Sequence, residues 1–223
     1  AGFATFDELF EAFRKQIRHF VDIKVRGSNV IEKLYATYLP APFLSVLVDD
    51  CVKTGRDYHA GGARYNTNYI QGVGVGTITD VLTAVRWNVY DHKHFTMKDL
   101  LAALAANFEG HAALRQRVLN RTPKFGNDDD YADGLMTRVF EAYFEAVDGR
   151  PTPRGGAYRI NLLPTTAHIY FGKMTGATAD GRLAGDAVSE GVSPVQGADR
   201  KGPTAVVKSL GKMDHVRTGG TLL

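Results

Sequence analysis

The stretch from Tyr158 to Gly172 constrains the fold of this chain more than any other. It is rich in β-branched and aromatic residues and is apolar at nearly every other position or better, which is typical of a β-strand. Near-continuous apolar strands are usually covered on both faces, as in α/β proteins. Pro164 cannot donate a hydrogen bond to a sheet, so we expect it to mark a break or a bulge. The pattern predicts a buried strand interrupted at Pro164.

Polar residues follow this interruption directly: Thr165, Thr166, His168 and Tyr170. Polar groups on a buried strand need hydrogen-bond partners. Those partners are either neighbouring backbone groups or a bound molecule. We therefore treat Thr166, His168 and Tyr170 as candidate substrate-binding residues. For His168, a hydrogen-bonded core histidine stays the alternative.

Composition narrows the class of protein. The chain has 223 residues, of which 44% are hydrophobic and 23% are charged, as in ordinary globular proteins. A net charge of +3 is small for this length and argues neither for nucleic acid nor for a membrane surface as a partner, so neither is expected. The single cysteine fits a reducing, cytoplasmic compartment. The sequence starts without Met and stops where a strand is expected to begin, so we interpret it as an internal segment of a longer polypeptide.

Helical spacing of apolar residues recurs along the first two thirds of the chain. Thr5 with Glu8 forms the pattern of a capping box, and Thr96 precedes another helix start. The residues from Ala205 and from Thr221 read as short strand or helix starts. Helices mixed with buried strands indicate the α/β class. The helices are expected over residues 6–24, 28–38, 43–53, 77–91, 97–108, 111–120 and, after a cap at Asn127, 128–148.

Two local patterns each have a functional and a structural interpretation. Gly72, Gly74 and Gly76 precede a helix and resemble half of a dinucleotide-binding fingerprint, but their spacing departs from it, so tight backbone packing is the favoured interpretation. The acidic run 128–130 could attract a metal. However, acidic residues in a first helical turn also offset the helix dipole, and no histidine lies nearby, so no metal site is predicted.

Cys51 and Arg182 also each have a functional and a structural interpretation. Cys51 has two aspartates before it, which would raise the pKa of its thiol, so a buried structural cysteine is favoured over a nucleophile. Arg182 follows Asp180 in an Asp-Gly turn signal. It could hold an anion, but bonding loop carbonyls is the default interpretation. No complete catalytic set follows from these residues.

Longer strings of residues lie along almost the whole chain: Gly61–Asn66, Tyr69–Gly74, Pro123–Asp133, Gly176–Arg182, Ser189–Pro194 and Gly202–Val206. These strings resemble the glycyl radical enzyme family. The resemblance implies a segment of a ten-stranded α/β barrel of the pyruvate formate-lyase type with helices outside, residues 1–223 being part of a single barrel domain. The branch that it resembles most comprises diol dehydratases, choline trimethylamine-lyase and isethionate sulfite-lyase.

Two family hallmarks are absent from the sequence. The thiyl-forming cysteine of the family lies in a Gly-Cys-x-Glu string and the radical glycine in an Arg-Val-x-Gly-Tyr string, and neither string occurs here. Cys51 matches a different family position. The resemblance therefore implies that the chain lacks the cysteine loop and the radical-glycine domain, holds no catalytic residue and is inactive alone.

The resemblance also implies a function for the whole enzyme. It would cleave a C–O, C–N or C–S bond next to a hydroxyl-bearing carbon in a diol, choline or isethionate type of substrate. The alternatives are a formate acetyltransferase-like C–C lyase and a non-catalytic barrel segment or scaffold. No cofactor would be bound here, because a radical-SAM activating enzyme would install the glycyl radical on the missing segment. A homodimer in the cytoplasm, or in a bacterial microcompartment, is implied as well.

Within that frame, the stretch after Pro164 is expected to supply substrate contacts. We expect Tyr170 to hydrogen-bond a substrate hydroxyl, with His168 and Thr166 on the same strand. Residues 160–172 contain no arginine, which favours a neutral diol or a choline-like substrate over a sulfonate.

Overall fold

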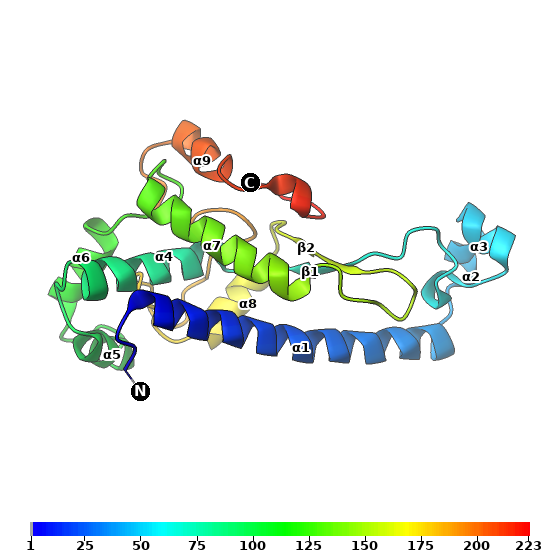
Figure 1. The fold of residues 1–223 in the computed structure, drawn as a ribbon, viewed down its shortest axis with the longest axis horizontal. Helices are drawn as coiled ribbons and strands as arrows, with labels where there is room; N and C mark the ends of the chain where they lie inside the picture. The colour runs from blue at the N-terminus through cyan, green and yellow to red at the C-terminus, as the bar shows by residue number, and fades with distance from the viewer. Residues whose placement is uncertain (1) are drawn as a thin grey trace. The chain divides into compact units, whose positions relative to one another are not determined.

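The structure is a computed structural model and describes residues 2–223. Most of the regular structure in this range is helical (Figure 1). The α-helices are α1 (Phe6–Tyr38), α2 (Pro42–Ser45), α3 (Asp49–Thr54), α4 (Val75–Val85), α5 (Met97–Ala105), α6 (Ala112–Asn120), α7 (Asp130–Val147), α8 (Ala167–Met174) and α9 (Pro203–Leu210); the strands are β1 (Asn68–Gln71) and β2 (Tyr158–Asn161).

The described chain divides into two compact units. The first unit comprises the residues up to Phe13 together with 71–142 and 161–223. The second unit comprises 14–70 and 143–160. The α/β class is therefore confirmed only in a coarse form: the chain is mostly helical with one small sheet, and its described residues do not by themselves close a barrel.

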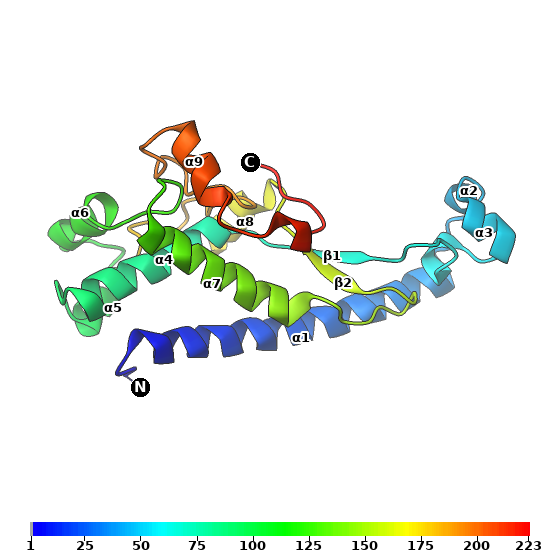
Figure 2. The same ribbon diagram turned by 45° about the horizontal axis from the view of Figure 1, so that its top comes forward.

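Strands β1 and β2 lie side by side in Figure 2. The N–H of Asn68 donates to the carbonyl of Ala157 at 3.1 Å, and the N–H of Gly72 donates to that of Asn161 at 2.9 Å. From the first of these bonds to the second, the residue numbers increase along both strands by the same amount. The strands are therefore parallel. A helix follows each strand, α4 after β1 and α8 after β2. The two strand-to-helix turns therefore leave the same edge of the sheet.

The core of the first unit is built on α4 and α7. Apolar residues recur at helical spacing along α7, and those that are fully buried form its inner face. Asp80 and three threonines of α4 are buried as well, so this helix is covered nearly all round. The apolar spacing that predicted a helix over 128–148 is thus confirmed. The buried apolar residues of α7 within this unit are Ala132, Leu135, Met136, Val139, Phe140 and Ala142.

Capping signals near α5 and α7 had different outcomes. The hydroxyl of Thr96 accepts from the N–H of Asp99, and the Asp99 carboxylate accepts from the N–H of Thr96, which is a complete capping box. The predicted cap at Asn127 is wrong. Asn127 instead donates to the carbonyl of Ala198 and accepts from the N–H of Lys201, because the chain segment near residue 200 lies against it.

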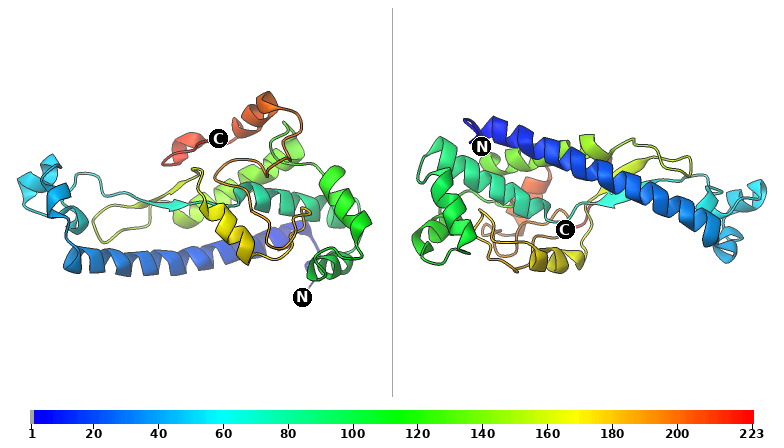
Figure 3. Two further views of the ribbon diagram at one scale, coloured as in Figure 1. Left: turned by 180° about the vertical axis from the view of Figure 1, so that it is seen from behind. Right: turned by 90° about the horizontal axis from the view of Figure 1, so that it is seen from below.

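Helix α1 runs without a break from Phe6 to Tyr38, as Figure 3 shows. The predicted stop at Gly27 is wrong. A Cβ at this position would meet no atom within 4 Å, so the glycine lies on an open helix surface. A glycine there costs the helix about 1 kcal/mol relative to alanine, which a helix of 33 residues tolerates.

In the second unit, the predicted single buried helix over 43–53 is replaced by the short helices α2 and α3, whose residues are mostly exposed. Cys51 is buried and free, as expected for a structural cysteine. Its Sγ would lie 2.8 Å from a Cβ added to Gly62, so the thiol packs directly against backbone. No helix in residues 2–223 is long and apolar enough to cross a membrane.

Candidate functional site

The turn that joins β2 to α8 holds the candidate substrate-binding residues. The predicted strand beyond Pro164 is wrong, because residues 167–174 form α8 with Thr166 at its N-cap position. A threonine shortly after a proline also begins helices, and that signal outweighs the β-propensity of Ile169 and its aromatic neighbours. The polar residues here therefore lie at a helix start, not on a buried strand.

A helix distributes these residues differently from a strand. Thr166 and Tyr170 are four residues apart and share one face of α8, whereas His168 lies on another face. A strand would have placed all three together. Thr166 is exposed and Tyr170 is 66% exposed, while His168 is half-buried. The structure thus brings Thr166 close to Tyr170 and separates both from His168.

Strand β1 fixes the position of this turn. The side-chain amide of Gln71 donates to the carbonyl of Leu163 at 2.5 Å, and its oxygen accepts from the N–H of Leu163 at 3.3 Å. On the other side, the N–H of Leu162 donates to the carbonyl of Gly220 at 2.9 Å. Leu162 also pairs with Thr221 in an isolated parallel bridge, at the position where a strand or helix start was predicted.

Helix α8 itself is anchored by close backbone packing. A Cβ at Gly172 would lie 2.2 Å from the carbonyl oxygen of Asp186, so only glycine fits there. The N–H of Val188 donates to the carbonyl of His168 at 3.3 Å. The Nδ1 of His168 lies within hydrogen-bond distance of the Thr165 carbonyl. A carbonyl can only accept, so Nδ1 carries the hydrogen and Nε2 is left for another partner.

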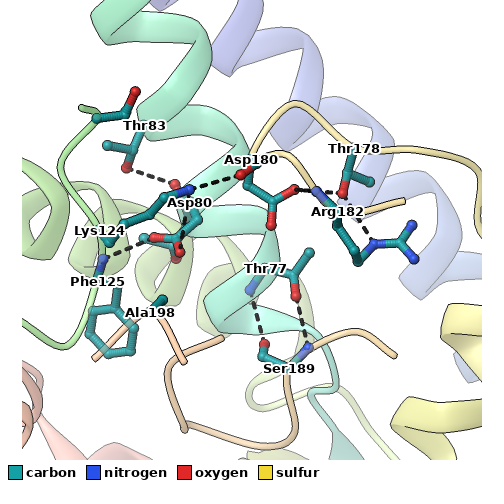
Figure 4. A network of polar contacts seen from close by, with 12 residues as sticks. Thr77, Asp80, Thr83, Lys124, Phe125, Thr178, Asp180, Arg182, Ser189 and Ala198 are labelled. Carbon is teal, nitrogen blue, oxygen red and sulfur yellow. Dashed lines mark hydrogen bonds and ion pairs between the residues drawn. The ribbon is translucent and has the colours of Figure 1, made fainter. Parts of the chain in front are cut away.

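Asp80 of α4 has a buried carboxyl group. The residue is 1% exposed, and its Oδ1 accepts from the N–H of Phe125 at 2.9 Å. Its Oδ2 has no hydrogen-bond partner and lies 4.0 Å from Nζ of Lys124. Burial raises the pKa of Asp80 to about 7, against the opposing charge of Lys124. Lys124 in turn donates to the carbonyl of Asp180 at 3.0 Å (Figure 4).

The turn that contains Asp180 is held by Arg182. Its guanidinium donates to the hydroxyl of Thr178 at 3.1 Å and to the carbonyl of Asp186 at 2.6 Å. It also donates to the carbonyls of Thr175, Gly176 and Leu183. This confirms the loop-bonding interpretation of Arg182 over that of an anion ligand, since its donors are used within the loop.

These elements line an open cavity of about 510 Å³. The structure brings Asp80 and Lys124 together with His168 at this cavity, and sequence reasoning missed the first two. The sequence did contain a signal for Asp80. An aspartate in the middle of an otherwise apolar helical run is expected to be buried, and buried aspartates are rare unless they are paired. The charged or ionisable residues that line the cavity are Asp80, Arg115, Lys124, His168, Asp180, Arg182, Asp186 and Arg200.

The glycines at the start of α4 have a structural role. Gly74 adopts a left-handed conformation with φ of 79°, and its N–H donates to the carbonyl of Ser189 at 2.8 Å. A Cβ at Gly76 would lie 2.6 Å from the carbonyl oxygen of Ser193. The 189–193 segment thus occupies the space that these glycines leave open, which confirms the interpretation of tight backbone packing.

The acidic run before α7 is paired with lysines. Asp128 lies 3.2 Å from Nζ of both Lys208 and Lys212, and these contacts lower the pKa of its carboxyl. Lys212 also contacts Asp130 at 2.7 Å. Across residues 2–223, no group of three or more histidine, cysteine or acidic side chains is arranged to hold a metal ion.

Two sequence profiles match the chain. The profile described as pyruvate formate lyase-like matches residues 1–172, and the one described as glycine radical matches residues 188–223. The second match places residues 188–223 in a domain that we expected to lie beyond the end of the chain. The Arg-Val-x-Gly-Tyr string is nevertheless not among these residues.

Individual relatives agree with these profiles. Trans-4-hydroxy-L-proline dehydratase of Clostridioides difficile is 58% identical over 222 residues, and the match covers 100% of this chain and 28% of that protein. (2S)-3-Sulfopropanediol dehydratase of Klebsiella oxytoca is 34% identical, with coverage of 99% and 28%. The chain thus spans 28% of the length of these two relatives.

A solved structure extends the comparison to three dimensions. The crystal structure of the C. difficile hydroxyproline dehydratase with trans-4-hydroxy-L-proline bound superposes with a TM-score of 0.97 at 58% identity, covering 100% of this chain and 28% of that one. The profile match over residues 1–172 covers more than half of the sequence. This chain belongs to the pyruvate formate lyase-like family of glycyl radical enzymes.

Proposed function

We propose that this chain is part of a glycyl radical dehydratase that removes water from a small hydroxylated molecule. The observation that carries the proposal is the 58% identity to trans-4-hydroxy-L-proline dehydratase over the whole chain, including both profile regions. The same identity favours a hydroxylated cyclic amino acid as the substrate. The neutral diol expected from the lack of arginine on residues 160–172 is the second candidate.

Residues of this chain do not supply the radical chemistry in this proposal. A glycyl radical, acting through a cysteine thiyl, would abstract hydrogen from the carbon next to the substrate hydroxyl. None of the 24 glycines lies in an Arg-Val-x-Gly-Tyr string, and the single cysteine, Cys51, is buried against Gly62. Both reactive residues therefore belong to other parts of the enzyme. A radical-SAM activating enzyme as partner and a cytoplasmic homodimer belong to the proposal as well.

The contribution of this chain is a substrate-binding turn at the carboxyl edge of the parallel strands. Ligands of sheets with helical crossovers bind at that edge. Thr166 lies there at the start of α8, where its hydroxyl is exposed and makes no capping bond. The N-terminus of a helix carries partial positive charge, which suits a carboxylate. Thr166 is thus proposed to hold a substrate carboxylate and Tyr170, on the same face, a hydroxyl or ring edge.

His168 has a different place in the proposal. It lies on another face of α8 and lines the cavity with Asp80, so it does not share the contact surface of Thr166 and Tyr170. Its bond to the Thr165 carbonyl orients the turn. His168 is therefore proposed to support the substrate-binding turn from behind.

The test uses the full-length protein, activated anaerobically by its activating enzyme until an electron paramagnetic resonance signal of a glycyl radical is present. Product analysis then compares trans-4-hydroxy-L-proline, propane-1,2-diol, choline and isethionate. We expect turnover of hydroxyproline. Turnover of the diol alone would overturn the amino-acid assignment. A radical signal with no turnover of any of the four would overturn the dehydratase proposal for these substrate classes.

Variants test the proposed contacts. Thr166→Val removes the hydroxyl at nearly constant shape, so we expect KM to rise roughly tenfold or more, the loss of one hydrogen bond to a charged group. Thr204→Val is a matched control, since Thr204 is an exposed threonine in the first turn of α9. An unchanged KM in Thr166→Val would remove Thr166 from the site.

A further inference from the structure

The cavity between α4, α6 and α8 has the features of a second ligand site. It is distinct from the proposed substrate contacts, because neither Thr166 nor Tyr170 lies among its lining residues. Its volume of about 510 Å³ falls in the range that holds small organic ligands. We propose that this cavity binds the anionic head of a small organic acid between Arg115, Lys124 and Arg200, with Oδ2 of Asp80 as a hydrogen-bond donor.

Two of the cationic groups are held next to each other by the protein. Nε of Arg115 donates to the carbonyl of Gly181 at 2.9 Å, and Nζ of Lys124 donates to the carbonyl of Asp180 at 3.0 Å. These carbonyls belong to consecutive residues, so the guanidinium and the ammonium lie on one short piece of backbone. Arg115 engages the carbonyl through Nε, which leaves its terminal nitrogens in position for an oxyanion.

The backbone under these cations is rigid. Arg182 bonds the loop on both sides of Asp180, and the Asp180 carboxylate accepts from the hydroxyl of Thr178 at 2.5 Å. The Asp180 carboxylate is thereby engaged inside its own turn. Preorganised donors lose little entropy when a ligand binds, so a fixed pair of cations favours recognition of an anion.

Arg200 adds a third cation to the lining. One of its terminal nitrogens donates to the side chain of Asn120 at 3.0 Å, which holds the guanidinium against the end of α6. Arg200 is exposed, so it lies where a ligand would enter. Of the acidic residues in the lining, Asp186 is exposed and accepts from the N–H of Leu183. The arginine and lysine residues of the lining outnumber its aspartates: Arg115, Lys124, Arg182 and Arg200 against Asp80, Asp180 and Asp186.

Asp80 supplies the independent observation that points to a ligand. Asp80 is one of the residues that line the cavity, and its buried Oδ2 has no hydrogen-bond partner, which is costly for a buried polar atom. Lys124 is too far away, at 4.0 Å, to satisfy it. A protonated carboxyl at this position would donate to an anion oxygen and so remove the deficit.

The protonation that this requires agrees with the surroundings of Asp80. Burial raises the pKa of Asp80 to about 7, and the nearby carboxylates of Asp180 and Asp133 act in the same direction. Lys124 and the N–H of Phe125 oppose the shift. The group is thus protonated in an appreciable fraction of molecules near neutral pH, and it becomes a hydrogen-bond donor there.

Isothermal titration of the full-length protein with sulfate and with acetate, at ionic strength kept constant with chloride, tests the proposal. Sulfate stands for sulfonate and phosphate heads and acetate for carboxylate heads, so the stronger ligand identifies the class. We expect saturable binding of at least one probe. No saturable binding of either probe would overturn the proposal.

Variants show whether the anion lies in this cavity. We expect Arg115→Ala and Lys124→Met each to weaken binding roughly tenfold or more, the loss of a charge-assisted contact. Arg117→Ala is the matched control, because Arg117 lies on the same helix but does not line the cavity. Equal affinity in wild type and Arg115→Ala would place the anion elsewhere. If Lys124→Met does not fold, Arg200→Ala replaces it, since Arg200 is exposed.

The pH dependence of sulfate affinity tests the role of Asp80 as a hydrogen-bond donor. A purely structural role of Asp80 would not change this pH dependence. Sulfate keeps its charge between pH 6 and pH 8.5, so the protein alone decides how sulfate affinity varies over that range. We expect affinity to fall roughly tenfold or more as pH rises through the pKa of Asp80, and this fall to vanish in Asp80→Asn, whose amide remains a donor. A pH profile shared by wild type and Asp80→Asn would exclude Asp80 from the site.

Discussion

Thr77 and Ser189 each donate a hydrogen bond to the other. The N–H of Thr77 donates to Oγ of Ser189 at 2.9 Å, and the N–H of Ser189 donates to Oγ1 of Thr77 at 2.7 Å (Figure 4). Both residues are buried. Thr77 lies in the region that matches the pyruvate formate lyase-like profile and Ser189 in the region that matches the glycine radical profile. This pair therefore joins the two profile regions at the start of α4.

We predict that Thr77→Val destabilises the protein by about 1–3 kcal/mol, because it leaves the buried N–H of Ser189 without an acceptor. Ser189→Ala removes the acceptor of the Thr77 N–H and should cost a similar amount. The double variant should cost less than the sum, since the two bonds join the same two residues and each helps to hold the other in place. Chemical denaturation of the three variants measures this. Strictly additive effects would show that the two bonds act independently.

Gly172 and Gly134 provide a matched pair for a second prediction. Both lie inside helices, but a Cβ at Gly172 would lie 2.2 Å from the Asp186 carbonyl, whereas a Cβ at Gly134 would meet no atom within 4 Å. We expect Gly172→Ala to destabilise by about 1–3 kcal/mol and Gly134→Ala to stabilise by about 0.4–1 kcal/mol. Denaturant midpoints decide the signs. A stabilising Gly172→Ala would show that α8 is free to move away from residue 186.

A third prediction concerns the pH dependence of stability. The pKa of Asp80 is raised from 3.8 to about 7 in the folded protein, so between these values the folded state binds more protons than the unfolded state. Its contribution to stability is therefore present at low pH and is lost as pH rises towards 7, with a slope of at most about 1.4 kcal/mol per pH unit.

Asp80→Asn removes this titration and keeps the acceptor for the N–H of Phe125. We expect its unfolding free energy to fall less than that of the wild type between pH 5 and pH 7.5. Urea denaturation at both pH values gives the comparison, and contributions from all other groups cancel in the difference. Parallel curves for the two proteins would mean that Asp80 has an ordinary pKa.

The fourth prediction addresses Arg182. Lysine keeps the charge but carries one nitrogen in place of the guanidinium fork, so it cannot reach acceptors on both sides of the loop. We expect Arg182→Lys to lower the free energy of local opening of residues 175–186 by about 1.5–3 kcal/mol. Amide hydrogen exchange of this segment measures the change. Arg121→Lys is the control, since Arg121 is exposed, and unchanged exchange in Arg182→Lys would contradict the prediction.

Local signals along the chain predicted a good part of this structure. The helix start at Thr96 and the apolar spacing of α7 are confirmed, as is the packing role of Gly74 and Gly76. The family strings predicted the family, which both profiles confirm. Each of these signals depends on residues close together in sequence or on long, specific strings. The identities of the residues suffice in such cases.

Elements whose state depends on distant neighbours were predicted less well. The stretch after Pro164 has the composition of a strand, yet it forms α8 because Gly172 packs against residue 186 and the Gln71 side chain holds the turn before it. Helix α1 passes through Gly27 because its neighbours leave that surface open. Composition alone does not report such contacts.

The family, the main helices and the segment from which substrate contacts are proposed follow from the order of the residues. The folded chain was needed to show that Thr166 and Tyr170 share a face of α8 while His168 lies on another face and lines a cavity with Asp80, because helical and extended backbone assign the same residues to different sides. It also decided that Asp80, Lys124 and Asp180 meet. The pKa of a carboxyl depends on the atoms around it, and these come from segments far apart in the chain.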